Sequence, residues 1–291
     1  DLSHAVRESA VLELSGPDRV DFLQGQLTQD VRRMTSGEVR PAAALTPKGK
    51  ILYVARLLAL EDRFLLLLPS ASRRPVLEHL RKYAAFQKVT LEDRSEALVR
   101  FAMYGSTPPE WPEHPAWQRL PGEGELAAEQ LVPASERDAF VGALESIGSR
   151  PIDPETAERL RVEAGRPRFG QDFDGSHLPD EVGLEAAIST TKGCYVGQEI
   201  VARLRTYGRV NRRLVGFRFP EGIVAPGSLL KRPEDEEAGK VEWGRVTSSV
   251  HSDRFGPIGL GFAFRDVPLE GRLVTIESPR RSAIVTALPF R

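Results

Sequence analysis

"TKGCYVGQEIVARL", residues 191–204, contains the only cysteine of the 291-residue chain, Cys194. Apolar residues recur at helical spacing after Gly197, so we expect a helix to begin near that glycine. Cys194 then lies just before a helix N-terminus, where unpaired backbone N–H groups and the nearby Lys192 favour a thiolate over a thiol. The alternative is that Cys194 packs in a core as a small hydrophobic residue, since cysteine is among the most buried residue types.

Two other cysteine chemistries fit the sequence poorly. A structural zinc site needs about four nitrogen or sulfur ligands at close spacing, and one cysteine with five scattered histidines does not supply them. No metal site is therefore expected. A cysteine protease needs a partner histidine. His177 is the nearest in sequence, and nothing in the residues alone brings it to the thiol.

Upstream of residues 191–204, residues 161–189 contain two glycine-bounded turns. Glu181 lies between Pro179 and Gly183 in this stretch. A carboxylate in a rigid turn can accept two parallel hydrogen bonds from a planar N–H donor edge. From the residues alone, a solvated turn acid or a neighbour of a helix N-cap is the simpler interpretation.

Downstream, "RLRTYGRVNRR", residues 203–213, carries arginines and no acid. Such a cluster suits an anionic ligand tail, a phosphate or RNA. An arginine run is more often a solvated or salt-bridged face. Tyr207 is the only aromatic residue among the arginines, so direct nucleic-acid binding is not expected.

Length and composition predict an ordinary globular protein of two or three domains. Hydrophobic residues make up 41% and charged residues 28% of the chain, and the formal net charge is −1. This balance argues against a protein dedicated to nucleic acids or membrane surfaces. The longest apolar stretch, residues 54–68, is interrupted by charged residues, so no membrane span is expected. A single cysteine and no visible export signal favour a cytoplasmic protein.

Apolar periodicity and turn residues predict the elements along the chain. Strands are expected at 10–16, 50–60, 63–69, 89–93 and 97–105, and helices at 16–31, 75–89, 133–148 and 153–165. Pro154 and Gly165 are expected at the start and stop of the last helix. Residues 105–124 are rich in proline and glycine and are predicted as a long surface connection. After residue 207, about six short strands predict a small β-barrel or sandwich.

Three stretches together resemble one family. "KGCYVGQEIVAR", residues 192–203, closely resembles the signature of the YgfZ family of folate-binding proteins. These are relatives of the aminomethyltransferase (T-protein) of the glycine cleavage system and of mitochondrial iron-sulfur assembly factors. "GPDRVDFLQGQLTQDV", residues 16–31, is similar to the N-terminal segment of that superfamily. "EAGRPRFGQDF" and "LPDEVGL", within residues 163–184, resemble the stretch before the signature.

The resemblance implies an α+β fold, a three-domain cloverleaf around a central channel that holds tetrahydrofolate. The implied first domain is discontinuous and carries the signature loop, the second is an inserted ferredoxin-like α+β domain, and the third is a C-terminal β-barrel. Their expected ranges are 1–48 plus 150–207, 49–149 and 208–291.

The resemblance also implies roles for individual residues. Glu181 would accept the pterin ring N3–H and 2-amino group together. The signature loop would line the same channel near the reactive end of the pteridine, and Arg203 would meet the anionic glutamate tail. The implied ligand-binding residues are Glu181, Lys192, Tyr195, Gln198 and Arg203, and Cys194 is the candidate catalytic residue.

One departure from the family pattern bears on the chemistry. Aminomethyltransferases carry an acidic pair where this chain has Tyr53 and Val54, so a carboxylate cannot handle protons there. Ordinary aminomethyl transfer is therefore not expected. The expected function is folate-dependent support of iron-sulfur cluster assembly or repair, including that of iron-sulfur enzymes that modify tRNA. Its expected partners are folate and iron-sulfur client proteins or assembly factors, and no membrane.

Two alternatives stay open. The first is a folate-dependent one-carbon transferase or demethylase, which needs a proton-transfer group elsewhere in the channel. The second is an RNA-binding module built on the arginine cluster of residues 203–213, whose binding would depend strongly on salt.

Overall fold

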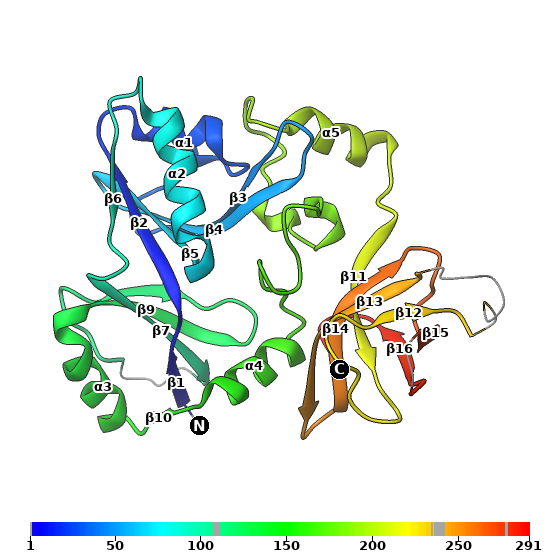
Figure 1. The fold of residues 1–291 in the computed structure, drawn as a ribbon. Coiled ribbons are helices and arrows are strands. Elements are labelled where there is room, and N and C mark those ends of the chain that lie inside the picture. The colour runs from blue at the N-terminus through cyan, green and yellow to red at the C-terminus, as the bar shows by residue number, and fades with distance from the viewer. Residues whose placement is uncertain (1, 107–110, 234, 236–241, 277–278) are drawn as a thin grey trace. The chain divides into compact units, whose positions relative to one another are not determined.

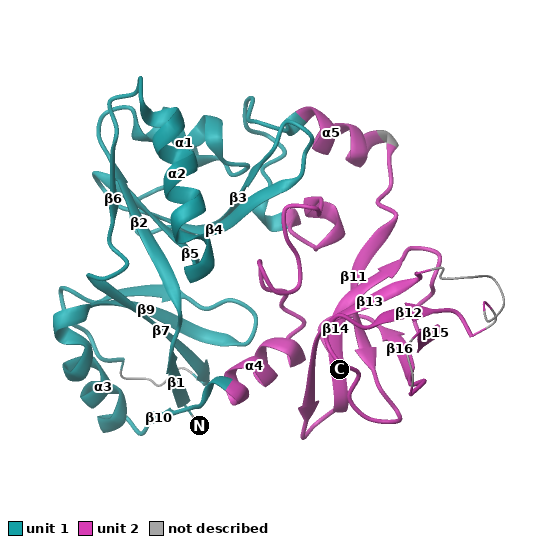
Figure 2. Ribbon diagram, viewed as in Figure 1, with its two compact units in different colours: residues 1–154, 186–198 teal, residues 155–185, 199–291 magenta. Residues whose placement is uncertain are grey.

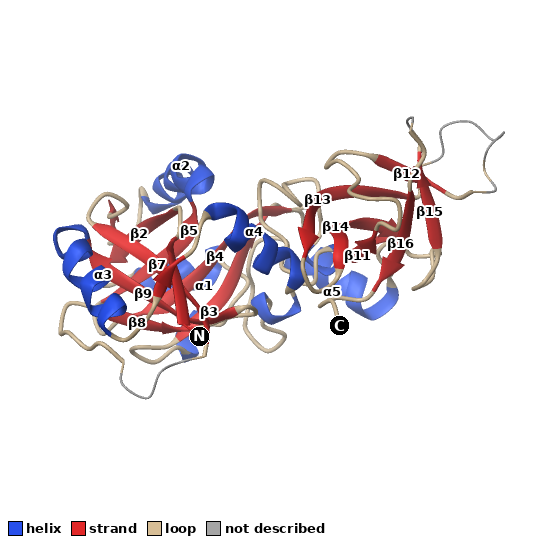
Figure 3. Cartoon of the chain, turned by 90° about the horizontal axis from the view of Figure 1, so that it is seen from below, coloured by secondary structure: helices blue, strands red, loops and turns tan. Residues whose placement is uncertain are grey.

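The computed structural model describes residues 2–106, 111–233, 235, 242–276 and 279–291 (Figure 1). The chain forms two compact units (Figure 2). Unit 1 comprises residues 1–154 and 186–198, and unit 2 comprises residues 155–185 and 199–291. Both units combine helices with strands (Figure 3), which confirms the expected α+β class.

Unit 1 contains two five-stranded sheets, with strand orders β3-β4-β5-β2-β6 and β10-β1-β7-β9-β8. All the pairings are antiparallel except that of β1 with β10. The strands of the first sheet are β2 (Ser9–Ser15), β3 (Val39–Leu45), β4 (Ile51–Ala59), β5 (Arg63–Pro69) and β6 (Thr90–Asp93). Those of the second are β1 (Leu2–Val6), β7 (Leu98–Gly105), β8 (Gln118–Pro121), β9 (Leu126–Pro133) and β10 (Arg150–Pro151).

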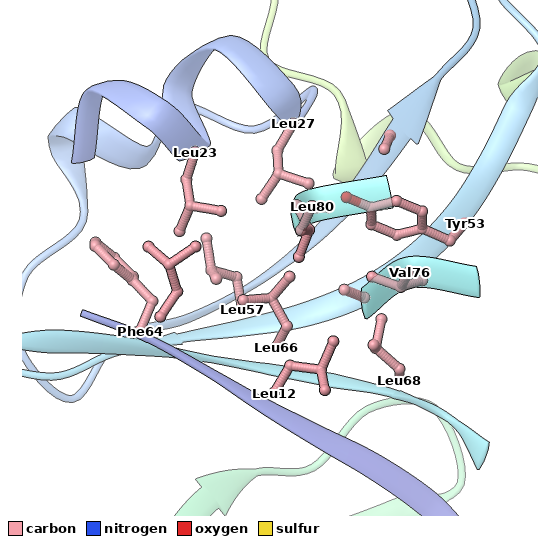
Figure 4. Packing of buried hydrophobic residues seen from close by; sticks show 14 of the residues in the cluster. Leu12, Leu23, Leu27, Tyr53, Leu57, Phe64, Leu66, Leu68, Val76 and Leu80 are labelled. Atoms are coloured by element: carbon pink, nitrogen blue, oxygen red, sulfur yellow. The ribbon is translucent and has the colours of Figure 1, made fainter. Parts of the chain in front are cut away.

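Both faces of the first sheet are covered, which explains why β5 is apolar at consecutive positions. One face packs against α1 (Arg19–Gln26) and α2 (Arg73–Ala84), which follows the short helix η2 (Ser70–Ser72). Figure 4 shows Leu23 of α1 and Leu80 of α2 pointing toward the sheet residues of this core. The other face packs Leu65 against Leu131 of the second sheet. Successive strand residues point to opposite faces, so each needs an apolar side chain here.

The helix expected at 16–31 is shorter in the structure. α1 ends at Gln26 after 8 residues, and the short helix η1 (Val31–Arg33) follows. The chain leaves the helix because Thr28 bonds elsewhere. Its N–H donates to the Ala43 carbonyl at 2.8 Å, and its hydroxyl donates to the Ala187 carbonyl at 2.6 Å. These tertiary hydrogen bonds replace further helical turns.

The expected connection over 105–124 contains a strand, which corrects the prediction; residues 107–110 lie outside the described part. β8 pairs with β9 at the edge of the second sheet. An edge strand tolerates a proline such as Pro121, and the burial of Leu120 supplies the apolar contact that holds it. The helix α3 (Arg137–Ser146) follows η3 (Ala134–Glu136) and packs Phe140 on Phe101, with ring centroids 4.9 Å apart.

A buried ionic cluster joins strands of unit 1. The Glu129 side chain is completely buried, and its carboxylate accepts hydrogen bonds from Arg7 at 2.8 Å and Arg100 at 2.7 Å. Arg56 of β4 also pairs with this carboxylate. Because Arg56 belongs to the first sheet and Glu129 to the second, the cluster links the two sheets.

Unit 2 contains η4 (Pro179–Glu181) and all but the first residue of α4 (Pro154–Glu163) and of α5 (Gln198–Tyr207), while η5 (Glu185–Ala187) spans the change between units. α4 begins at Pro154, and Gly165 beyond its end has a φ of 69°, as the sequence predicts for a helix stop.

Six strands of unit 2 form a closed barrel in the order β11-β14-β13-β12-β15-β16, which confirms the predicted C-terminal barrel. They are β11 (Arg212–Arg218), β12 (Leu229–Lys231), β13 (Gly244–Ser252), β14 (Gly256–Phe264), β15 (Arg272–Thr275) and β16 (Ser282–Thr286).

The three-domain division expected from the sequence stays a prediction. The first sheet contains strands on both sides of residue 48, since β3 and β4 pair across it. Of the helices that the structure describes, none combines the length and the apolar character that crossing a membrane requires.

Candidate functional site

Cys194 lies on an exposed loop just before α5, which begins at Gln198 as predicted. We call residues 191–197 the signature loop; it belongs to unit 1. Exposure of Cys194 contradicts the alternative in which the cysteine packs in a core. The thiol is therefore accessible to a reagent or a partner protein.

Lys192, two residues earlier, is buried, with 7% of its surface exposed. Its Nζ donates to the backbone carbonyls of Gln24 and Leu27, each at 2.6 Å, and of Gln29 at 2.9 Å. An ammonium has three N–H donors, and these three carbonyls match them. Burial lowers the pKa of Lys192 to about 8.

Tyr195 and Gln198 bond to each other where the signature loop meets α5. The Tyr195 side chain is buried, and its ring centroid lies 5.1 Å from Lys192 Nζ. The Tyr195 N–H donates to Gln198 Oε1 at 3.3 Å, and the Gln198 N–H donates to the Tyr195 carbonyl at 3.2 Å. Gly197 has a φ of 84° and lies so close to the turn between β3 and β4 that a Cβ would come 2.5 Å from the Thr46 carbonyl oxygen.

Unit 2 has a cavity of about 680 Å³ between residues 170–177 and the barrel strands. Small-molecule sites commonly enclose about 300–1,000 Å³. Its walls are aromatic and charged, and include Phe173, His177, Arg212, Arg245, Phe262 and Phe264. The cavity is therefore large enough for a flat ring system and has groups of both kinds to hold one.

Glu181 lies next to this cavity, because it is bonded to Arg212, which lines the cavity. Glu181 is buried, with 7% exposed, and its Oε1 accepts from Arg212 Nε at 3.1 Å. Its Oε2 accepts from the Leu178 N–H at 2.9 Å. A carboxylate offers about four lone-pair sites, so both oxygens keep acceptor capacity. Arg212 lines the cavity and lies 5.6 Å from the Phe262 ring centroid.

His177 lines the cavity and is a residue that sequence reasoning did not assign to a ligand site. Its ring lies 4.6 Å from that of Phe262, and its Nδ1 is 3.1 Å from Asp174 Oδ1. Burial, with the neighbouring Arg212, lowers the pKa of His177, and Asp174 partly opposes this. The imidazole is therefore mainly neutral at pH 7. The available signal was its position in the sequence, four residues before Glu181.

Comparison with known proteins decides the family. No family model matches the chain. The tRNA-modifying protein YgfZ of Escherichia coli O157:H7 is 31% identical over 254 residues, covering 78% of this chain and 72% of that protein. The YgfZ protein of Colwellia psychrerythraea is 30% identical over 222 residues, covering 71% and 68% respectively. The chain belongs to the YgfZ family.

A more distant relative and a solved structure also match the chain. A putative chloroplastic transferase of Arabidopsis thaliana is 27% identical over 314 residues, covering 100% of this chain and 70% of that protein. The glycine cleavage system aminomethyltransferase T of Bartonella henselae matches with a TM-score of 0.87 and 20% identity, over 100% of this chain and 86% of that one. This YgfZ family member therefore has the aminomethyltransferase T fold.

Positions 53 and 54 of this YgfZ family member offer no acid. Tyr53 is buried against α2, 5.7 Å from the ring of His79, and its hydroxyl has no hydrogen-bond partner in the described part of the chain. Burial raises the pKa of the Tyr53 hydroxyl. Val54, the next residue of β4, is half-buried. Neither side chain takes or gives a proton near neutral pH.

The arginine cluster of residues 203–213 is largely a salt-bridged face. Arg205 pairs with Asp180 at 3.2 Å, Arg212 pairs with Glu181, and Arg213 donates to the Val267 carbonyl at 2.9 Å. Arg203 is exposed on α5, and its expected contact with an anionic tail stays a prediction. Within residues that the structure describes, no group of three or more potential metal ligands occurs.

Proposed function

We propose that this chain binds a tetrahydrofolate-type ligand and supports iron-sulfur cluster assembly or repair, including that of iron-sulfur enzymes that modify tRNA. The observation that carries the proposal is the unit 2 cavity, with the Glu181–Arg212 pair beside aromatic walls. Membership of the YgfZ family and the aminomethyltransferase T fold support a folate-related role.

The cavity supplies the interactions that a pterin needs. Phe262 and His177 line the cavity with their rings 4.6 Å apart, and aromatic side chains are groups against which a flat ring can stack. Glu181 is an acceptor-only group when ionised, and the pterin N3–H and 2-amino group are two adjacent donors. Arg212 pairs with this carboxylate at 3.1 Å and fixes its direction. The signature loop belongs to unit 1, and we assign the reactive thiol of Cys194 to the client chemistry.

Glu181→Gln is expected to weaken tetrahydrofolate binding about 10- to 100-fold, since a charge-assisted hydrogen bond is worth about 1.5–3 kcal/mol. Isothermal titration calorimetry of the full chain measures this. Glu185→Gln, which changes an exposed acid in the next turn, is the matched control and should bind as the unaltered chain does. Equal binding by both variants would remove Glu181 from the site.

Cys194→Ser is expected to abolish rescue of iron-sulfur enzyme activity in a strain that lacks the endogenous protein. A hydroxyl is not ionised near neutral pH, whereas a thiol near a helix N-terminus is a nucleophile or a cluster ligand. Because the residue is exposed, the fold and the tetrahydrofolate Kd should not change. Full rescue by the serine variant would exclude Cys194 from the function.

One observation favours a second candidate, a folate-dependent one-carbon transferase or demethylase. That reaction needs a proton-transfer group, and His177 with its Asp174 partner lines the cavity. A neutral imidazole with a lowered pKa can accept a proton near pH 7. Turnover of glycine-like or N-methyl substrates with tetrahydrofolate, lost in His177→Gln, distinguishes this candidate.

A further inference from the structure

The buried Lys192 of the signature loop reaches the C-terminal end of α1. The last carbonyls of a helix have no partners within the helix, and a cation is stabilised there by the helix dipole. The carbonyls of Gln24, Leu27 and Gln29 converge on Lys192 Nζ at 2.6 to 2.9 Å. Lys192 thus satisfies backbone groups that are left open because α1 ends early.

The same end of α1 is joined to the chain before Lys192 by further hydrogen bonds. The Thr28 hydroxyl donates to the Ala187 carbonyl at 2.6 Å, and the Ser189 N–H donates to the Thr28 carbonyl at 3.0 Å. Gln29 Nε2 donates to the Ala186 carbonyl at 3.2 Å. We call these bonds, together with those of Lys192, the α1 seam. It connects residues 24–29 with residues 186–192 within unit 1.

We infer that Lys192 is a positioning residue: its ammonium ties the signature loop to the end of α1 and so holds Cys194 at the surface. The three carbonyls accept from all three N–H donors of the ammonium, and only 7% of Lys192 is exposed. Lys192 therefore has no donor left for the ligand. Tyr195 and Gln198 bond to each other where the signature loop meets α5 and so fix its other end. This inference rests on the role proposed above for Cys194.

Burial of the ammonium, more than the charges around it, sets how the α1 seam responds to pH. Asp30 raises and Arg32 lowers the pKa of Lys192, and burial is the largest cause of its fall from 10.5 to about 8. Tyr195 presents its ring to the ammonium, and Arg32 is paired with Asp21. Between pH 8 and 10.5 the unfolded chain binds more protons at this site than the folded chain. The contribution of Lys192 to the free energy of unfolding therefore rises with pH across that window, because the folded chain no longer has to bury a charged ammonium.

The test compares the full chain with Lys192→Met, which keeps an unbranched apolar stem and removes the ammonium. Hydrogen–deuterium exchange should show at least a 10-fold loss of protection in residues 24–29 and 186–198. Cys194, no longer held at the surface, should react more slowly with Ellman's reagent. The tetrahydrofolate Kd should stay within about 2-fold. A Kd raised 10-fold with unchanged protection would overturn the inference. Failure of folate binding in the unaltered chain would count against the proposed function and leave the exchange comparison valid.

A measurement on the unaltered chain covers the case in which Lys192→Met does not fold. The Lys192 side-chain ¹³Cε signal is titrated from pH 6 to 11, with and without saturating tetrahydrofolate. We expect the same midpoint in both titrations, because the ammonium faces carbonyls and not the ligand. A midpoint that tetrahydrofolate moves by about one pH unit or more would show direct contact and overturn the inference.

Discussion

Replacing Glu129 by alanine is expected to destabilise unit 1 by about 3–5 kcal/mol, because it removes the buried acid that three arginines share. The Glu129 side chain is 0% exposed, and those of Arg100 and Arg56 are 4% and 12% exposed. Without the carboxylate, these guanidinium groups would face each other and Arg7 in a region that water hardly reaches. Since Arg56 lies on the first sheet, the loss should also loosen the packing of one sheet on the other.

Guanidinium chloride unfolding, followed by the fluorescence of the tryptophans, measures this change. Glu96→Ala is the matched control, since Glu96 also pairs with an arginine, Arg73 at 2.7 Å, but with a side chain 86% exposed. An exposed pair contributes at most about 1 kcal/mol. If the two variants lost similar stability, the cluster would have no special part in joining the sheets.

The sequence predicted those elements whose pattern is local. The apolar runs of β4 and β5, the helical spacing of α2 and α5, and the six late strands all appear in the structure. Two elements depended on partners distant in sequence. α1 ends early because Thr28 bonds to Ala43 and Ala187, and β8 forms because β9 offers it an edge. Neither partner is visible in a local window of sequence.

In the candidate site, too, the sequence predicted what depends on local spacing and missed what depends on distant partners. The position of Cys194 just before α5 followed from local spacing, whereas its exposure did not, since a buried cysteine was the open alternative. The partners of Lys192 did not, because Gln24 lies 168 positions away. Glu181 was singled out through a family resemblance, and its pairing with Arg212 spans 31 positions. Phe262 gave no signal, since an aromatic residue in a strand is ordinarily part of a core.

Gly197→Ala is expected to displace the signature loop, because that position is closed to any side chain. Its φ of 84° would cost a residue with a Cβ about 1–2 kcal/mol. The added Cβ would also lie 2.5 Å from the Thr46 carbonyl oxygen and 3.0 Å from the Leu45 Cβ. The Thr46 carbonyl cannot easily retreat, since it accepts the Gly49 N–H at 2.9 Å in the turn between β3 and β4.

Gly193→Ala is the matched control within the same loop, since no atom lies within 4 Å of a Cβ at that position. Gly193 also lacks a positive φ, so alanine fits its backbone. Hydrogen–deuterium exchange should show lost protection over residues 191–198 for Gly197→Ala alone, with rescue of iron-sulfur enzyme activity reduced accordingly. The tetrahydrofolate Kd should not change in either variant, because the residues that line the proposed ligand cavity include none of the signature loop. If Gly197→Ala moved the loop and rescue stayed complete, the position of Cys194 would not matter, and the thiol would act without the fixed geometry that Lys192 and Gly197 give it.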